Sequence, residues 1–121
     1  MAVISSHVLD SVTGTHASGI RVECYQRMQG GQTAKVFDVI ASAEGRISEQ
    51  VHVDADADYD LVFHSAAYFE SVALPDDGYQ VVKSIVVRIA LPDPNDTYHF
   101  PIMLAPHSYS IWWSGKPPVK T

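Results

Sequence analysis

Histidine is the residue type in this sequence best suited to chemistry, because an imidazole takes up and returns a proton near neutral pH. The chain carries six histidines. None has the spacing of zinc ligands, as in His-Glu-x-x-His, so we expect no metal site. On residue type alone, His7 in a strand-like segment predicts a structural, hydrogen-bonded imidazole, and Arg46 in a turn predicts a solvated charge. A catalytic role for these side chains therefore needs further support.

Two other groups of reactive side chains indicate structural roles. Cys24 is the single cysteine and lies in a strand-like run, so we expect a small buried core residue and not a reactive thiol. The acidic run Asp54–Asp58 resembles the opening of a calcium loop, but Tyr59 and Ser65 stand where that loop needs glycine and glutamate. We interpret the run as a solvated acidic turn.

Length and composition favour one domain over residues 1–121, with a loose tail at 117–121. Of the 121 residues, 46% are apolar and 18% are charged, as is typical of a globular protein. The net charge of −6 repels phosphate backbones and argues against nucleic-acid binding. No apolar run could span a bilayer, and residues 1–6 lack the features of a secretory signal, so we expect a cytoplasmic protein without a membrane partner.

Strand-like segments separated by turns dominate the chain and predict an all-β sandwich. Glycines at 30–31 and at 45 mark turns, and Ser11–Gly19 is predicted to be a loop. Ser65–Leu74 has weak strand propensity and predicts one short helix that ends before Pro75. The predicted strands, about eight in number, cover residues 3–9, 20–27, 34–41, 48–53, 59–64, 81–91, 98–104 and 109–113.

A series of short motifs runs along the chain in a fixed order. The first is Ser6–Asp10, followed by Gly14, and it is similar to a Thr/Ser-His-Val-Leu-Asp signature. The later motifs are Gly19–Val22, Ala43–Arg46, Leu61–Ser65, Tyr68–Phe69, Tyr98–Pro101, Leu104–Pro106 and Ser108–Ser110. Taken together, from about residue 4 to residue 115, they resemble the transthyretin / 5-hydroxyisourate hydrolase family.

The resemblance implies a transthyretin-like (prealbumin-like) eight-stranded β-sandwich with one short helix. Members of the family dimerise through sheet edges, and two dimers stack into a homotetramer with a central channel. The hydrolases place their active sites in that channel and open the ring of 5-hydroxyisourate, a step in purine breakdown. They need neither a metal nor an organic cofactor. Transthyretins use the same channel to carry thyroid hormone.

The resemblance also assigns catalytic roles to three residues: His7, Arg46 and His99. Opening a cyclic amide requires an activated water, stabilisation of charge on the carbonyl oxygen and a proton for the leaving nitrogen. Imidazoles at positions 7 and 99 would activate water and transfer protons, with the identity of the base left open. The guanidinium of Arg46 would bind and polarise the substrate.

The chain departs from the family pattern at the end of the matched region. The hydrolases carry Tyr-Arg-Gly-Ser, a tetrapeptide that lines the site, and the aligned residues here are Trp112, Trp113, Ser114 and Gly115. One positive charge is thereby lost. Two further departures are Thr97, where a histidine is common, and His16, where a proline is usual.

The two tryptophans change the ligand that such a site would prefer. We assign substrate binding to Trp112, Trp113 and Ser114, since flat rings stack well on indole side chains. Adjacent residues on a strand face opposite sides, so at most one tryptophan should face the channel. We favour Trp113, because it aligns with the lost arginine.

Three functions remain open from the sequence. The first is a cofactor-free hydrolase of the 5-hydroxyisourate type, acting on a small cyclic amide, with a diverted substrate or a diversion to isomerisation or cyclisation as variants. The alternative is a non-catalytic, transthyretin-like carrier that binds a hydrophobic ligand in the tetramer channel. The third is a purely structural protein, because fold does not fix function.

Overall fold

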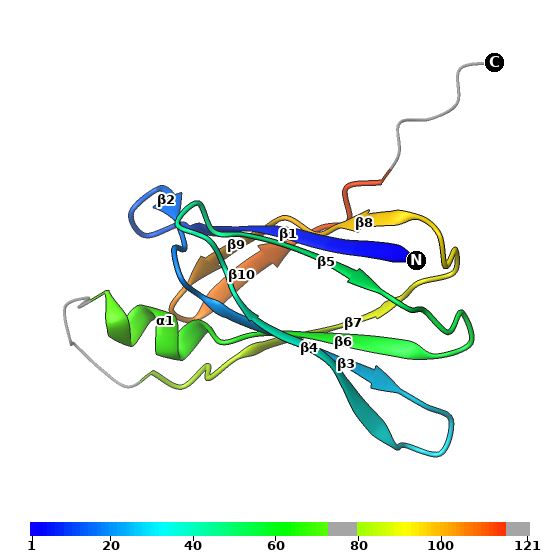
Figure 1. Cartoon of the computed structure of the whole chain (residues 1–121). Coiled ribbons are helices and arrows are strands. Elements are labelled where there is room, and N and C mark those ends of the chain that lie inside the picture. Colours follow the sequence, from blue (N-terminus) through cyan, green and yellow to red (C-terminus); the bar gives the residue numbers. More distant parts are fainter. Residues whose placement is uncertain (73–79, 116–121) are drawn as a thin grey trace.

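The computed structural model describes residues 1–72 and 80–115, which form two stacked β-sheets with a short helix at one end (Figure 1). No helix in these ranges is long and apolar enough to cross a membrane. The helix is α1 (Ser65–Ser71). The strands are β1 (Ala2–Asp10), β2 (Thr15–His16), β3 (Arg21–Arg27), β4 (Thr33–Ile40), β5 (Arg46–Val51), β6 (Asp58–Phe63), β7 (Ile85–Ala90), β8 (Thr97–His99), β9 (Ile102–Ala105) and β10 (Ser108–Ile111).

Strand β1 is the centre of the first sheet. It pairs antiparallel with β5 and β2 and parallel with β8 and β9, and β10 extends the sheet beyond β9. The second sheet has the order β4-β3-β6-β7, with antiparallel pairing throughout. The expected all-β sandwich with one short helix is confirmed.

The side chains of β1 alternate between the interior and the outer face. Ile4 and Val8 are fully buried between the sheets, whereas Ser5 and His7 are only half-buried on the outside. This period of two follows from the pleat of a strand whose one face covers the core. The first sheet therefore buries one face against the core, and the side chains of its other face, including His7, are accessible to a ligand.

The core between the sheets includes the single cysteine. Cys24 lies on β3 and is fully buried, and burial raises the pKa of its thiol to about 12. Such a thiol stays protonated at neutral pH and is a poor nucleophile. The prediction that Cys24 is a structural core residue is confirmed. Other large side chains that are fully buried are those of Tyr59, Phe63, Ile20, Leu61, Leu91, Ile102 and Leu104.

The late strands differ most from the sequence-based expectation. The segment expected at 98–104 is split into β8 and β9, and Pro101 lies in the break. Proline has no N–H to donate to a ladder, so it interrupts a central strand. The backbone of β1 takes part in the break, since the N–H of Phe100 donates to the carbonyl of Ser5 at 2.9 Å. The strand expected at 81–91 begins only at Ile85.

The predicted loop and the predicted helix agree in part with the structure. The predicted loop Ser11–Gly19 contains the two-residue strand β2, which pairs with the end of β1. The helix is confirmed at Ser65–Ser71. Its predicted end at Leu74 and the loose tail predicted at 117–121 lie outside the described residues.

Helix α1 is tied to β1 through a buried hydrogen bond. The hydroxyl of Tyr68 donates to Oδ2 of Asp10 at 2.8 Å, and Asp10 is almost fully buried. Burial and this bond raise the pKa of Tyr68 to about 12, so the phenol remains a neutral donor. The other carboxylate oxygen of Asp10 accepts from the backbone N–H groups of Val12 and Thr13.

We predict that Tyr68→Phe lowers the free energy of unfolding by about 1–3 kcal/mol, because a buried carboxylate loses a donor. Urea denaturation measures the change. Tyr109→Phe is the matched control, since that ring is half exposed and its variant should unfold like the native protein. Equal stability of the native and Tyr68→Phe proteins would contradict the anchoring role.

Candidate active site

The pairing register of β1 brings three of the candidate residues to one face of the first sheet. His7 lies opposite Arg46 on β5, and Ser5 lies opposite His99 on β8. Directly opposed residues in a sheet project to the same side. His7, Arg46 and His99 come from three separate strands, and the structure thus places all three side chains on the open outer face.

A tight turn before β5 positions Arg46. Gly45 has φ of +70°, and a Cβ there would stand 2.4 Å from the carbonyl oxygen of Val8. The turn is closed by Ser42, whose hydroxyl accepts from the N–H of Arg46 at 3.2 Å. The carbonyl of Gly45 in turn accepts from the N–H of Val8 at 2.8 Å. Only glycine allows this close approach, which seats the first residue of β5 beside His7.

The ring of His7 has polar partners on both sides. Its Nε2 lies 2.9 Å from Nδ1 of His16 on β2. Partial burial, followed by the charge of Arg46 and the proximity of His16, lowers the pKa of His7 below its ordinary value. A hydrogen bond to the backbone of Glu44 opposes that shift. The imidazole is therefore mainly neutral at pH 7 and can accept a proton.

His99 is held by a serine of β1. Its Nδ1 lies 2.8 Å from Oγ of Ser5, which fixes the ring plane and leaves Nε2 on the other side of the ring. Burial lowers the pKa of His99, and the positive charge of Arg46 lowers it further. Both candidate imidazoles are thus kept in the neutral form by the same two causes.

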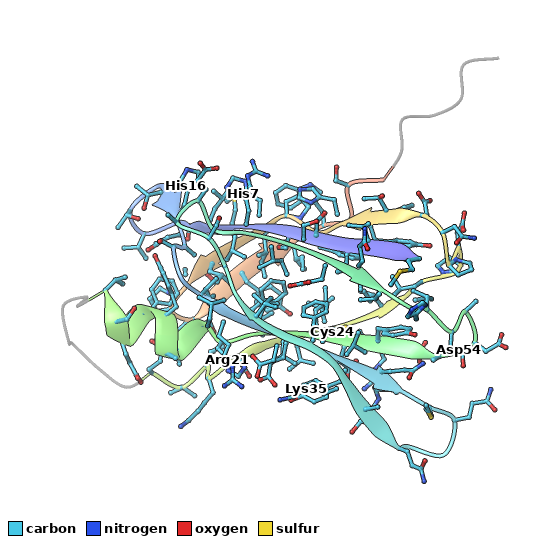
Figure 2. The ribbon with its side chains drawn as sticks, in the orientation of Figure 1. His7, His16, Arg21, Cys24, Lys35 and Asp54 are labelled. Carbon is cyan, nitrogen blue, oxygen red and sulfur yellow. The ribbon has the colours of Figure 1, made fainter. Side chains whose placement is uncertain are left out.

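The charge on Arg46 is available for a ligand. Among residues 1–72 and 80–115, no carboxylate forms a salt bridge with it. The outer face of the second sheet is different, because Arg21 and Lys35 there pair with Asp38 and Glu23. Figure 2 shows His7 and His16 together on one side of the sandwich and Arg21 and Lys35 on the other. The unpaired cation and the neutral imidazoles occur on the same face.

The side chains on this face are of the types that the hydrolysis of a cyclic amide uses. A neutral imidazole can take a proton from water, a fixed guanidinium can stabilise a developing oxyanion, and the resulting imidazolium can protonate a leaving nitrogen. No cluster of three or more potential metal ligands occurs in the described part of the chain.

The residues after β10 stay close to His99. Ser114 forms a bridge with His99, and Ser110 pairs with Met103, so both serines face outward. Trp112 and Trp113 lie between them and are 47% and 59% exposed. Trp113 lines an apolar cavity of about 320 Å³, with Ile89, Ala90, Pro92, Tyr98 and Phe100.

Of the three residues expected to bind substrate, Ser114 is placed beside His99 by this bridge. The assignment of Trp112 and Trp113 to substrate binding, with Trp113 favoured, stays a prediction.

Two further residues of the site were not identified from the sequence. Ser5 holds His99, and His16 contacts His7. Ser5 could have been predicted from the alternation of β1, because residues two apart on a strand share a face and Ser5 is two residues before His7. His16 was noted only as an unusual residue, since its strand falls within a predicted loop.

Comparisons with known proteins identify relatives along nearly the whole chain. The family model "HIUase/Transthyretin family" matches residues 4–113. A 5-hydroxyisourate hydrolase of Pseudomonas aeruginosa is 31% identical, over 93% of this chain and 90% of that protein. A 5-hydroxyisourate hydrolase of Halalkalibacterium halodurans is 30% identical, over 90% of this chain and 94% of that protein. The crystal structure of transthyretin from Sparus aurata superposes with a TM-score of 0.74 at 19% identity, over 91% of this chain and 94% of that one.

We predict that Gly45→Ala destabilises the protein and displaces Arg46. A left-handed backbone at a residue with a Cβ costs about 1–2 kcal/mol, and the contact with the Val8 carbonyl adds to that. Gly14→Ala is the matched control, because Gly14 also has a positive φ but has no atom within 4 Å of the added Cβ. Urea denaturation should show the larger loss for Gly45→Ala. Equal losses would contradict the close approach.

Proposed function

The chain belongs to the HIUase/Transthyretin family, and on that premise we propose that it is a cofactor-free hydrolase of the 5-hydroxyisourate hydrolase type. It would act in purine breakdown in the cytoplasm. The observation that carries the proposal is the shared outer face of His7, Arg46 and His99, set by the register of β1. The curated relatives with that activity match over nine-tenths of this chain or more.

The proposed reaction uses the three side chains in sequence. Arg46 binds the carbonyl oxygen of the cyclic substrate and polarises it. One of the two neutral imidazoles takes a proton from water, and the hydroxide adds to the carbonyl carbon. The tetrahedral intermediate then collapses with cleavage of the ring C–N bond. The imidazolium returns its proton to the leaving nitrogen, so the protein is restored without any cofactor.

The substrate-binding residues in this proposal are Trp112, Trp113 and Ser114. Ser114 bridges His99, and the exposed indoles beside it offer flat apolar surfaces for a ring. The position of the family's arginine carries no charge, since Trp113 stands there. We therefore propose a flat cyclic amide or imide as substrate, with 5-hydroxyisourate as the first candidate. A bulkier ring, or an isomerisation or cyclisation by the same acid–base groups, is the diverted form of the proposal.

We propose further that the active form is a homotetramer, a dimer of dimers, with the site at the boundary between dimers. Support comes from the apolar side chains on the same face, since Met103 is 41% exposed and lies opposite Leu9. The edge strands β7 and β10 offer unpaired backbone groups for dimerisation in the described ranges. Light scattering should give four times the chain mass of 13.3 kDa. A monomeric mass at micromolar concentration would contradict this assembly.

The activity is tested with freshly made 5-hydroxyisourate, whose ultraviolet absorbance is followed against its spontaneous decay. We expect the native chain to accelerate ring opening, and His7→Ala or His99→Ala to lower kcat by about 10²–10⁴-fold, the usual contribution of an acid–base group. Arg46→Gln should mainly weaken transition-state binding. His107→Ala is the matched control, since His107 is an exposed residue of the turn between β9 and β10.

Two results would contradict the proposal. A native chain that never exceeds the spontaneous rate on this substrate or on related cyclic amides would exclude the hydrolase. Saturable binding of a hydrophobic ligand that survives both histidine changes would indicate the carrier instead.

A further inference from the structure

Two histidines on the outer face form a directly bonded pair. His16 lies opposite Leu9, so it is the diagonal neighbour of His7 on the same face. Nε2 of His7 and Nδ1 of His16 are 2.9 Å apart, and the ring centroids are 5.1 Å apart with a tilt of 35°. Figure 2 shows the two labelled rings side by side at this end of the sheet.

The contact between the rings joins Nε2 of His7 and Nδ1 of His16. One of these nitrogens therefore carries the hydrogen and the other the lone pair. A hydrogen bond from His7 to the backbone of Glu44 favours the form in which His16 donates its Nδ1–H to Nε2 of His7. The nitrogen of the pair that is left for water is Nε2 of His16, an exposed residue.

We propose that His7 and His16 work as one two-imidazole base, in which His16 is the catalytic residue that contacts the attacking water. This inference rests on the proposed hydrolase function. The O–H bond of water breaks and its proton goes to Nε2 of His16. The proton on Nδ1 of His16 passes to Nε2 of His7, and the hydroxide adds to the substrate carbonyl. When the ring C–N bond breaks, Nε2 of His16 returns its proton to the leaving nitrogen and His7 returns its Nε2 proton to His16.

The surroundings favour the return of the proton. Three groups face His7: Arg46 from β5, His99 from β8 and His16 from β2. Partial burial and all three of these groups disfavour a positive charge on its ring, whereas a hydrogen bond to the backbone of Glu44 favours it. An imidazolium formed at His7 is therefore held for a short time and readily gives its proton back through His16.

A structural role alone does not account for the pair. Strand β2 is held by its backbone: the N–H of Ala17 donates to the carbonyl of Val8 at 2.9 Å, and the N–H of Gly14 donates to the carbonyl of Asp10 at 2.9 Å. The bond between the rings is exposed, and such a bond adds little to stability. Changes of His16 should therefore leave the fold intact and report on chemistry.

The test compares His16→Asn with His16→Phe in the intact chain, using 5-hydroxyisourate as the probe. An asparagine side chain can still donate a hydrogen bond to Nε2 of His7, but it cannot pass on a proton. A phenylalanine can do neither. We expect both variants to lower kcat by about 100-fold, within the range of acid–base catalysis, with KM changed less than about twofold. His52→Phe, at an exposed histidine after β5, should behave as the native chain.

The double variant His7→Ala/His16→Phe should be no slower than His7→Ala alone, since a relay loses its function once either ring is removed. Full activity of His16→Phe would overturn the proposal. Restored activity in His16→Asn would also overturn it, because His16 would then only orient His7.

If the native chain does not act on the probe, the proposed function fails and the pair is judged by nitrogen NMR. The relay requires the Nδ1–H of His16 to donate to Nε2 of His7 in the native chain, so the Nε2 signal of His7 should shift when His16→Phe removes the donor. An unchanged Nε2 signal of His7 in that variant would overturn the pairing itself.

Discussion

The register of β1 against its neighbours is the constraint on which the site depends. On one side, β5 brings Arg46 opposite His7, and on the other, β8 brings His99 opposite Ser5. A slip of one residue would turn His7 into the core and Val8 to the surface. That slip would bury an imidazole and expose a fully buried side chain, so the hydrophobic alternation that stabilises the sheet also fixes the geometry of the site.

The two outer faces of the sandwich use charge in opposite ways. On the second sheet, Glu23 is buried among Tyr25, His64 and Lys35, and these contacts lower its pKa to about 2. The charges there satisfy one another, which makes that face chemically inert. On the first sheet, Arg46 has no carboxylate partner among the described residues, and burial together with its field lowers the pKa of two imidazoles. A guanidinium without a carboxylate partner in the described ranges, beside neutral imidazoles that can accept a proton, suits the proposed hydrolysis.

The local sequence pattern predicted most of the fold and part of the candidate site. The alternation of β1 and the glycine turns at 30–31 and 45 were visible in the sequence, and all those glycines have positive φ. The features that the sequence did not predict depend on contacts between residues far apart in the chain. Pro101 divides a predicted strand, and β1 pairs with the segments on both sides of the break. The bridge between His99 and Ser114 also joins residues from different segments of the chain. His16 gains its partner only when a predicted loop folds back on β1.

The central claim is that strand pairing half-buries two imidazoles beside one guanidinium, so that burial and the positive charge together keep both neutral. Titration of His7 and His99 by nitrogen NMR, in the native chain and in Arg46→Gln, measures this directly. The account predicts that both ring pKa values lie below the ordinary value of 6.5 in the native chain and rise when the charge is removed. Native pKa values at or above 6.5, or values that do not respond to Arg46→Gln, would contradict it.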